Sequence, residues 1–187
     1  MQRFLPFAVF FVVLGASRLI GAVSGDSLVN FSPLPALFFC GMAFYGWRGA
    51  ILPAAVWLVT YPITNLMQGY SLGAQLWVPV LGFAAMLGLA RWFQKSSQLR
   101  TLSGSLLAGL IFYVLTNTLS WAMDPGYAPK SLATLGQALW TGLPGLPPTY
   151  LFFRNAMVAQ ALFTVLFLLA HHSMSGLPAR RLATAKS

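Results

Sequence analysis

The chain is nearly devoid of acidic residues, since only Asp26 and Asp124 accompany eleven lysines and arginines in 187 residues. Charged residues make up 7% of the sequence, whereas a soluble domain contains about 25%. Hydrophobic residues account for 58%, and the mean hydropathy is +0.74. This shortage of charge excludes an ordinary soluble protein and predicts an integral membrane protein.

Several chemistries also lack the residues they need. The single cysteine excludes an intrachain disulfide. Two carboxylates and two histidines offer few ways to build general acid–base catalysis, and no GxSxG, HExxH or P-loop motif occurs. We therefore expect no enzymatic activity, no catalytic residue and no cofactor, and a membrane enzyme is the least favoured alternative. The net charge of +9 is spread between apolar runs instead of clustered on a polar face, which argues against nucleic-acid binding.

Six apolar runs are candidates to cross a bilayer, which requires about 20 mostly apolar residues per helix. The predicted spans cover residues 4–23, 33–47, 50–67, 72–93, 104–123 and 150–170. The sequence thus predicts an all-α, polytopic membrane protein in which six transmembrane helices form one bundle and one domain, 1–187. The first run is interpreted as a retained helix, because it is too long for a signal peptide. Pro62 lies inside the third run and should kink or break that helix.

The loops and their charges predict how the bundle is oriented. Residues 94–103 form the most polar loop, and residues 124–149 form a long loop rich in proline and glycine, whose middle, 131–140, can form a short interfacial helix. Eight of the eleven cations fall on one side of the predicted bundle: Arg3, Arg48, Arg91, Lys95, Arg100, Arg180, Arg181 and Lys186. By the positive-inside rule, both termini face the cytoplasm and the 124–149 loop faces outward, in the inner membrane of a bacterium.

Polar side chains within the runs or next to their ends are concentrated toward the predicted outer side. They are Arg18, Asn30, Asn65, Gln68, Asn117, Arg154 and Asn155. A single polar residue in lipid usually joins helices, at about 0.6 kcal/mol, and an arginine near the end of a span often reaches the interface. Packing between helices does not explain why these polar residues gather in the outer half of the membrane. A polar cavity open to the outside does explain it. We therefore interpret all seven as substrate-binding residues.

Aromatic residues and one cysteine extend this interpretation. Tyr70, Trp121 and Tyr127 lie near the same side and are expected to pack on a ligand, although tyrosine and tryptophan belts form at both membrane interfaces. Cys40 lies within the second run, where a lone cysteine usually acts as a small hydrophobe. Its functional alternative is a soft ligand to a metal-centred molecule such as cobalamin.

Four short motifs resemble a bacterial family of uncharacterised small membrane proteins. They are Asn30-Phe31-Ser32-Pro33, Leu115-Thr116-Asn117, the 127–135 stretch and Phe153-Arg154-Asn155. This resemblance spans nearly the whole chain, and the family brings no known activity.

The expected architecture also resembles the S-component of energy-coupling-factor transporters, which bind vitamins and other micronutrients behind outer loops that act as gates. This resemblance implies a substrate-binding transport protein for uptake of a small micronutrient, with a vitamin such as cobalamin as the specific prediction and an energising ATPase module as a partner. The first helix carries Gly15-Ala16-Ser17 and Gly21-Ala22 instead of an Ala-xxx-Ala contact, which is similar to a solitary S-component. In that subset, Cys40 becomes a candidate cobalt ligand.

The alternative is a non-transporting accessory subunit of a larger membrane complex. Small residues would supply its contact faces, namely Gly82, Ala85, Gly88, Ala90, Gly104, Ala108 and Gly109. A carrier should contain a closed polar cavity near Arg18 and Arg154. A subunit should instead bury these arginines in the interface with its partner.

Overall fold

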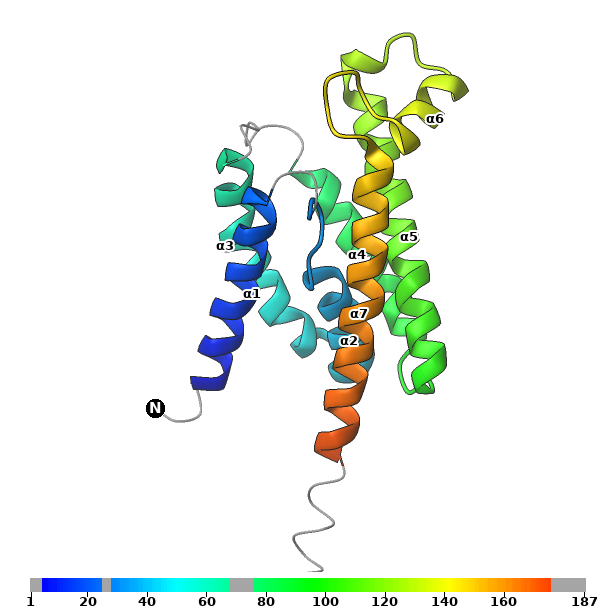
Figure 1. Ribbon diagram of the computed structural model, residues 1–187. Helices are drawn as coiled ribbons and strands as arrows, with labels where there is room; N and C mark the ends of the chain where they lie inside the picture. The colour runs from blue at the N-terminus through cyan, green and yellow to red at the C-terminus, as the bar shows by residue number, and fades with distance from the viewer. Residues whose placement is uncertain (1–4, 25–27, 68–75, 176–187) are drawn as a thin grey trace, which may run out of the picture.

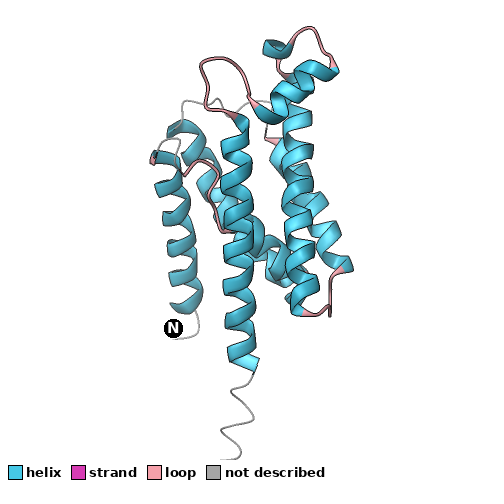
Figure 2. Cartoon of the chain, turned by 45° about the vertical axis from the view of Figure 1, so that its right-hand side comes forward, coloured by secondary structure: helices cyan, strands magenta, loops and turns pink. Residues whose placement is uncertain are grey.

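The computed structural model describes residues 5–24, 28–67 and 76–175, and every regular element in these ranges is a helix (Figures 1 and 2). In chain order the elements are α1 (Leu5–Val23), α2 (Leu34–Tyr45), α3 (Trp47–Met67), α4 (Trp77–Trp92), α5 (Gln98–Met123), the 3₁₀ turn η2 (Pro125–Tyr127), α6 (Leu132–Trp140) and α7 (Thr149–Ser175). No strand occurs in these ranges. The predicted all-α fold is confirmed.

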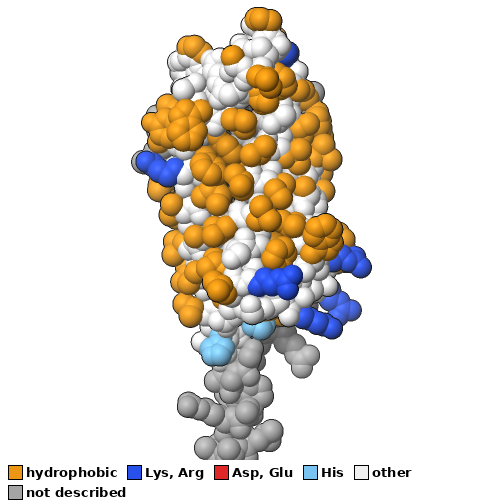
Figure 3. Space-filling model, turned by 90° about the vertical axis from the view of Figure 1, so that its right-hand side faces the viewer, with side chains coloured by type: hydrophobic (Ala, Val, Ile, Leu, Met, Phe, Trp, Pro, Cys, Tyr) orange, Lys and Arg blue, Asp and Glu red, His pale blue; other side chains and the backbone are white. Residues whose placement is uncertain are grey.

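The helices run between two ends of the molecule (Figure 1). The α6 end carries η2, α6 and the 28–33 segment. The basic end carries the start of α1, the end of α7 and a group of exposed cations, Arg48, Arg91, Lys95 and Arg100. On the face drawn in Figure 3, lysines and arginines gather mainly toward this end, and hydrophobic side chains cover the middle of the bundle.

Three helices, α3, α5 and α7, are long and apolar enough to cross a membrane. α5 has 26 residues and α7 has 27. At 1.5 Å per residue each is about 40 Å long, which exceeds the roughly 30 Å hydrocarbon core of a bilayer. α2, α4 and the Val12–Val23 part of α1 are apolar but shorter.

α2 is the central helix of the core, although it has only 12 residues. Its buried residues are Leu34, Ala36, Phe38, Phe39, Cys40, Gly41, Met42 and Ala43. A helix of this length covers about 18 Å, little more than half of the hydrocarbon core. The chain reaches it through the non-helical 28–33 segment, which descends from the α6 end into the bundle (Figure 1).

α2 and α3 form a helical hairpin in which two backbones touch. The chain turns at Gly46, whose φ of 63° favours glycine. A Cβ atom on Gly41 would lie 2.3 Å from the carbonyl oxygen of Gly49, and one on Gly49 would lie 2.1 Å from that of Gly41. Pro53 has no N–H, so it cannot donate the helical hydrogen bond to Gly49. The freed Gly49 carbonyl faces the Cα of Gly41, where a weak Cα–H···O contact can form.

Two local features differ from the prediction. α5 begins at Gln98, inside the loop expected over 94–103, because Ser97 caps the helix and its hydroxyl accepts a hydrogen bond from the N–H of Arg100 at 3.4 Å. α3 also continues through Pro62 as one helix, so the break allowed for at that residue does not occur. Pro62 has no N–H and so cannot donate to the carbonyl of Leu58, four residues earlier. The side chains of Thr64 and Asn65 both donate to the carbonyl of Tyr61, at 3.1 and 2.8 Å.

Most of the small residues expected to contact a partner protein pack inside the bundle instead. A Cβ atom on Gly82 would lie 2.6 Å from the ring of Phe112, and one on Gly104 would lie 2.5 Å from the ring of Phe93. Ala90 and Ala108 are fully buried. These residues allow α4 and α5 to approach closely and are not available to a second protein.

Candidate functional site

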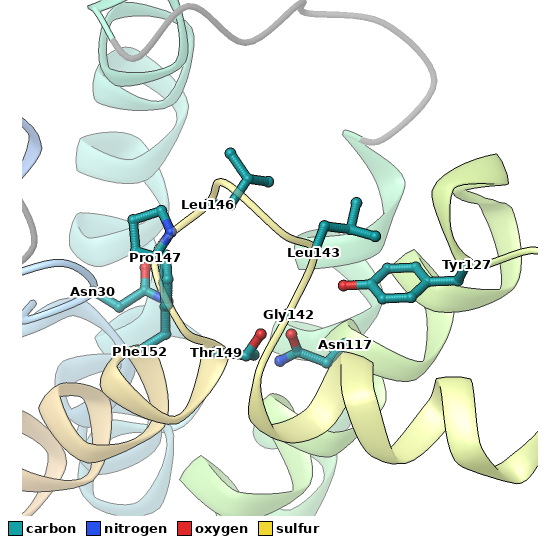
Figure 4. Close-up of a pocket in the computed structure, with 9 residues that line it drawn as sticks. All are labelled: Asn30, Asn117, Tyr127, Gly142, Leu143, Leu146, Pro147, Thr149 and Phe152. Atoms are coloured by element: carbon teal, nitrogen blue, oxygen red, sulfur yellow. The ribbon is translucent and has the colours of Figure 1, made fainter.

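Two cavities lie at the α6 end and share Asn30 as a wall. The cap cavity, of about 150 Å³, has polar walls from Asn30, Asn117, Tyr127 and Thr149 and apolar walls from Leu143, Leu146, Pro147 and Phe152 (Figure 4). The arginine cavity, of about 80 Å³, is lined by Arg18, Gly21, Ala22, Leu28, Asn30, Phe31, Ser32 and Thr64. The two cavities thus bring together residues that are far apart in the sequence.

Asn30 lies in the 28–33 segment, in the left-handed conformation with a φ of 59°. Asparagine tolerates this conformation better than other side chains, so the turn itself favours it here. The segment is folded locally, because the Phe31 N–H donates to the Leu28 carbonyl at 2.9 Å. The Phe31 ring also packs edge-on against Phe163 of α7, with ring centroids 5.8 Å apart.

α7 holds this segment through Asn155. The Asn155 side chain is 6% exposed, and its Nδ2 donates to the carbonyl of Val29 at 3.0 Å. Its Oδ1 accepts hydrogen bonds from Nε and Nη2 of Arg154, at 3.2 and 3.1 Å. Arg154 is exposed and lines neither cavity. The predicted pair of ligand-binding residues is therefore placed to position the 28–33 backbone.

The floor of the cap cavity presents an amide and a hydroxyl that face each other, from Asn117 and Thr149 (Figure 4). Nδ2 of Asn117 donates to the carbonyl of Tyr113 in its own helix at 2.8 Å. The Oδ1 atom is therefore the part of this amide that can accept a hydrogen bond from a ligand. Sequence reasoning identified Asn117 but missed Thr149, because a threonine at the start of an apolar run carries no distinguishing signal.

Tyr127 contributes a hydroxyl to the same cavity and is 9% exposed. Burial raises the pKa of Tyr127, and the nearby Asp124 carboxylate raises it further. The hydroxyl therefore stays protonated at neutral pH and can donate a hydrogen bond to a ligand. In Figure 4 it points toward the space enclosed by the 142–147 loop.

The cap above this cavity is tied together by Trp121 and Lys130. Nε1 of Trp121 donates to Oγ1 of Thr134 in α6 at 3.1 Å. The Lys130 ammonium lies 5.5 Å from the Trp121 ring centroid and 5.8 Å from that of Tyr127, and it donates to the Trp121 carbonyl. Trp121, predicted to pack on a ligand, does not line either cavity and instead fastens α6 to the end of α5.

The loop that closes the cap cavity is fixed at Gly142. Its N–H donates to the Gln137 carbonyl at 2.8 Å, and Nε2 of Gln137 donates to the Gly142 carbonyl at 3.0 Å. The φ of 73° favours glycine at this position. A Cβ atom there would lie 2.8 Å from Oγ1 of Thr149. Glycine is therefore needed both for the turn and for the space beside the cavity floor.

The arginine cavity contains the guanidinium of Arg18, which is half-buried. Its Nη2 donates to Oγ1 of Thr64 at 3.5 Å, which is long for a hydrogen bond. Its Nε is buried and has no hydrogen-bond partner. Arg18 makes no ion pair within the described ranges. Arg18 lines a partly open cavity, whereas Arg154 lines neither cavity, so the structure does not show the closed cavity that was expected to contain both arginines.

The other predicted site residues lie apart from both cavities or outside the described ranges. Asn65 donates from Nδ2 to the carbonyl of Tyr61 at 2.8 Å and lines neither cavity. Gln68 and Tyr70 belong to residues 68–75, which the structure does not describe. Cys40 is fully buried in the core, with its thiol against Thr164, and also lines neither cavity.

A second group of polar side chains, the Gln160 cluster, joins α5 to α7 deep in the bundle. It consists of Ser105, Gln160 and Thr164, none more than 2% exposed. Ser105 Oγ and Thr164 Oγ1 are 2.7 Å apart, and Nε2 of Gln160 donates to Oγ and to the carbonyl of Ser105 at 2.6 and 3.1 Å. Sequence reasoning missed this cluster, because each member is a single polar residue in a long apolar run.

The described part of the chain is all-helical, has three helices able to cross a membrane and contains two cavities with partly polar walls at one end, which is typical of a helical membrane protein and offers a candidate small-molecule site. Residues 1–181 match a family of unknown function, DUF6580, and the chain belongs to this family. No curated protein and no solved structure matches the chain.

Proposed function

We propose that this protein is a substrate-binding membrane transport protein for uptake of a small micronutrient, similar in design to an S-component. One observation carries the proposal. Polar side chains from α1, the 28–33 segment, α3, α5, η2 and α7 line two cavities that share Asn30, and the cap borders the larger one. Small-molecule sites are concave and combine apolar walls with a few convergent polar groups. Both cavities have walls of both kinds.

The proposal includes six crossings of a bacterial inner membrane with both termini in the cytoplasm. The start of α1 and the end of α7 share the basic end, and the positive-inside rule assigns that end to the cytoplasm (Figure 1). α2 together with the 28–33 segment forms the second crossing. Transporters commonly place such interrupted helices at the substrate site, because irregular backbone is tolerated in a membrane only where protein or a cavity covers it.

The cavity volumes favour a ligand of modest size in the present arrangement. About 150 and 80 Å³ together fall short of the roughly 300 Å³ at which pockets for drug-sized molecules begin. A vitamin as large as cobalamin therefore requires η2, α6 and the 142–147 loop to move aside. In the proposal this cap is the outer gate, and its movement admits the ligand from outside the cell.

Thermal unfolding of the purified protein against a panel of micronutrients tests this function. The panel runs from small organic acids and amines through the vitamins to cobalamin. A compound at 100 times its dissociation constant adds about 2.7 kcal/mol to the stability of the folded state. Asn117→Ala should abolish this gain for the compound that binds.

Asn65→Ala is the matched control for this experiment. Both asparagines donate to a carbonyl four residues earlier at 2.8 Å, but only Asn117 lines a cavity. The gain should persist in Asn65→Ala. If no compound stabilises the protein, and the protein is stable only with another subunit, the function is that of an accessory subunit instead.

A further inference from the structure

Arg18 is a cation inside an apolar helix and has no carboxylate partner among the residues that the structure describes. By insertion scales, an arginine at the centre of a span costs about 2.5–3.5 kcal/mol, and such residues normally pair with a carboxylate or a carbonyl. Its guanidinium has five N–H donors. Among the described residues, the 3.5 Å contact with Thr64 uses one of these donors, and Nε is buried without a partner there.

The space beside this guanidinium is shaped for a small polar group. The arginine cavity holds about 80 Å³, whereas one water molecule occupies about 30 Å³ in the liquid. Gly21 and Ala22 are small residues, which leave space beside α1 at this point. The hydroxyls of Ser32 and Thr64 border the same space. The cavity is large enough for a carboxylate or a phosphate group and too small for a whole vitamin.

The start of α2 adds a second source of positive potential. Ser32 lines the cavity, and α2 begins two residues later, at Leu34. The amino-terminal end of a helix carries a partial positive charge, which favours anions within the first turn. The amino-terminal end of α2 lies inside the bundle, where Leu34 is fully buried. In transporters, the amino-terminal ends of half-helices likewise face anionic groups of the substrate. The cation and the helix end thus favour the same ligand charge.

We propose that the arginine cavity is an anion subsite that binds a carboxylate or phosphate group. Arg18 supplies paired N–H donors to two anion oxygens. Ser32 borders the same space, and its hydroxyl, whose oxygen accepts from the Leu34 N–H at 3.3 Å, keeps its own proton to donate. The assignment of this anion to the transported micronutrient rests on the proposed function. The micronutrient is then an anionic molecule, whose remaining atoms extend past Asn30 into the cap cavity.

The test measures the thermal unfolding midpoint of the full-length protein in nonionic detergent. Sodium acetate and sodium phosphate are titrated separately, each against sodium chloride at equal ionic strength. The wild-type protein should show a saturable rise of several degrees with at least one of the two anions. Arg18→Gln should lose this rise, Arg18→Lys should retain a smaller one because lysine cannot bind two oxygens side by side, and exposed Arg48→Gln should retain it fully.

A second variant keeps the test valid if Arg18→Gln does not fold. A Cβ atom on Gly21 would make ordinary contacts with the Phe31 and Leu28 carbonyls, at 3.5 and 3.8 Å. Gly21→Ala should therefore fold and should leave the anion-free midpoint unchanged or higher. Because the added methyl group narrows the cavity, the anion-dependent rise should shrink.

The outcomes separate the sources of the anion and the two proposals. A phospholipid that copurifies in equal amount with the wild type, but not with Arg18→Gln, would assign the subsite to a lipid headgroup. A saturable response to acetate or phosphate without such a lipid would assign it to a free ligand. No anion response, or a response that survives in Arg18→Gln, would overturn the subsite. The micronutrient panel with Asn117→Ala tests the cap cavity independently of this result.

Discussion

Two groups of polar side chains lie within the same bundle and differ in how fully they are hydrogen-bonded. In the Gln160 cluster, side-chain hydrogen bonds of 2.6 and 2.7 Å join residues that are at most 2% exposed. At the α6 end, Arg18 has one contact at 3.5 Å, and its Nε is unpaired beside a cavity. Satisfied polar groups join helices, whereas unsatisfied ones retain the capacity to bind something else. Within the described residues, hydrogen-bond satisfaction, more than polarity itself, distinguishes the Gln160 cluster from Arg18.

Packing also differs between the α2–α3 hairpin and the wall of the arginine cavity. At the α2–α3 hairpin the backbones of Gly41 and Gly49 are in direct contact, which leaves no space for a methyl group. In the wall of the arginine cavity, a Cβ atom on Gly21 would meet its neighbours only at ordinary distances, although the cap is tightly packed at Gly142. The closely packed part can serve as a rigid frame, and the looser part can admit a ligand.

Gly41→Ala should produce the largest loss of stability. The new methyl group would overlap the Gly49 backbone, which cannot move without displacing α3, so we expect a loss of about 3 kcal/mol in the free energy of unfolding. Gly88→Ala is the control, because nothing lies within 4 Å of its Cβ position. It should gain up to about 1 kcal/mol. Equal stability of the two variants in detergent would contradict the backbone contact.

Gln160→Leu should have the next largest effect. The substitution removes both hydrogen bonds to Ser105, which is fully buried, and we expect a loss of about 1.5 kcal/mol. Asn117→Leu should cost less, since the only hydrogen bond of that amide is made within its own helix. Thermal unfolding without ligand compares the two. A larger loss for Asn117→Leu would reverse the assignment of structural and functional regions.

Asn155→Ala should cost about 1 kcal/mol, because the Val29 carbonyl loses its donor. The effect should be concentrated in the 28–33 segment. Amide hydrogen exchange should accelerate there and stay unchanged in the middle of α5. Asn65→Ala is the comparison, since its amide contacts only its own helix. Unchanged exchange over 28–33 in Asn155→Ala would show that α7 does not hold the segment.

Lys130→Met should have the smallest effect on global stability. Its ammonium is exposed, and cation–π contacts at such sites contribute about 0.5–1 kcal/mol each. The loss should appear as faster proteolysis between residues 124 and 148, with an almost unchanged unfolding midpoint. Proteolysis at the wild-type rate would mean that Trp121 and Thr134 suffice to hold the cap.

Much of this fold follows from apolar runs alone. The expected run over 33–47 contains α2 (Leu34–Tyr45), and the helix expected within the long loop corresponds to α6 (Leu132–Trp140). α5 begins earlier than expected because the hydroxyl of Ser97 caps it. A hydropathy pattern does not detect such a capping residue. The contact of Gly41 with Gly49 depends on how two helices cross, so no local pattern predicts it.

The candidate site was less predictable, because residues with the same local pattern have different surroundings. Asn65 and Asn117 make the same bond to their own helices, yet only Asn117 reaches a cavity. Arg18 and Arg154 both lie near the ends of apolar runs, but Arg154 binds Asn155 at the surface. The orientation of each helix decides between these outcomes, and it is set by packing among distant segments.

The shortness of α2 also constrains how the chain is inserted during synthesis. A segment enters the lipid on its own only with about 20 apolar residues, and α2 provides 12. α3 follows after Gly46 alone and has 21 residues. We therefore expect α2 to remain in the translocon until the ribosome has synthesised α3. The two helices would then enter the membrane together as a hairpin. Synthesis of α3 would then be the step that commits the core helix of this protein to the bilayer.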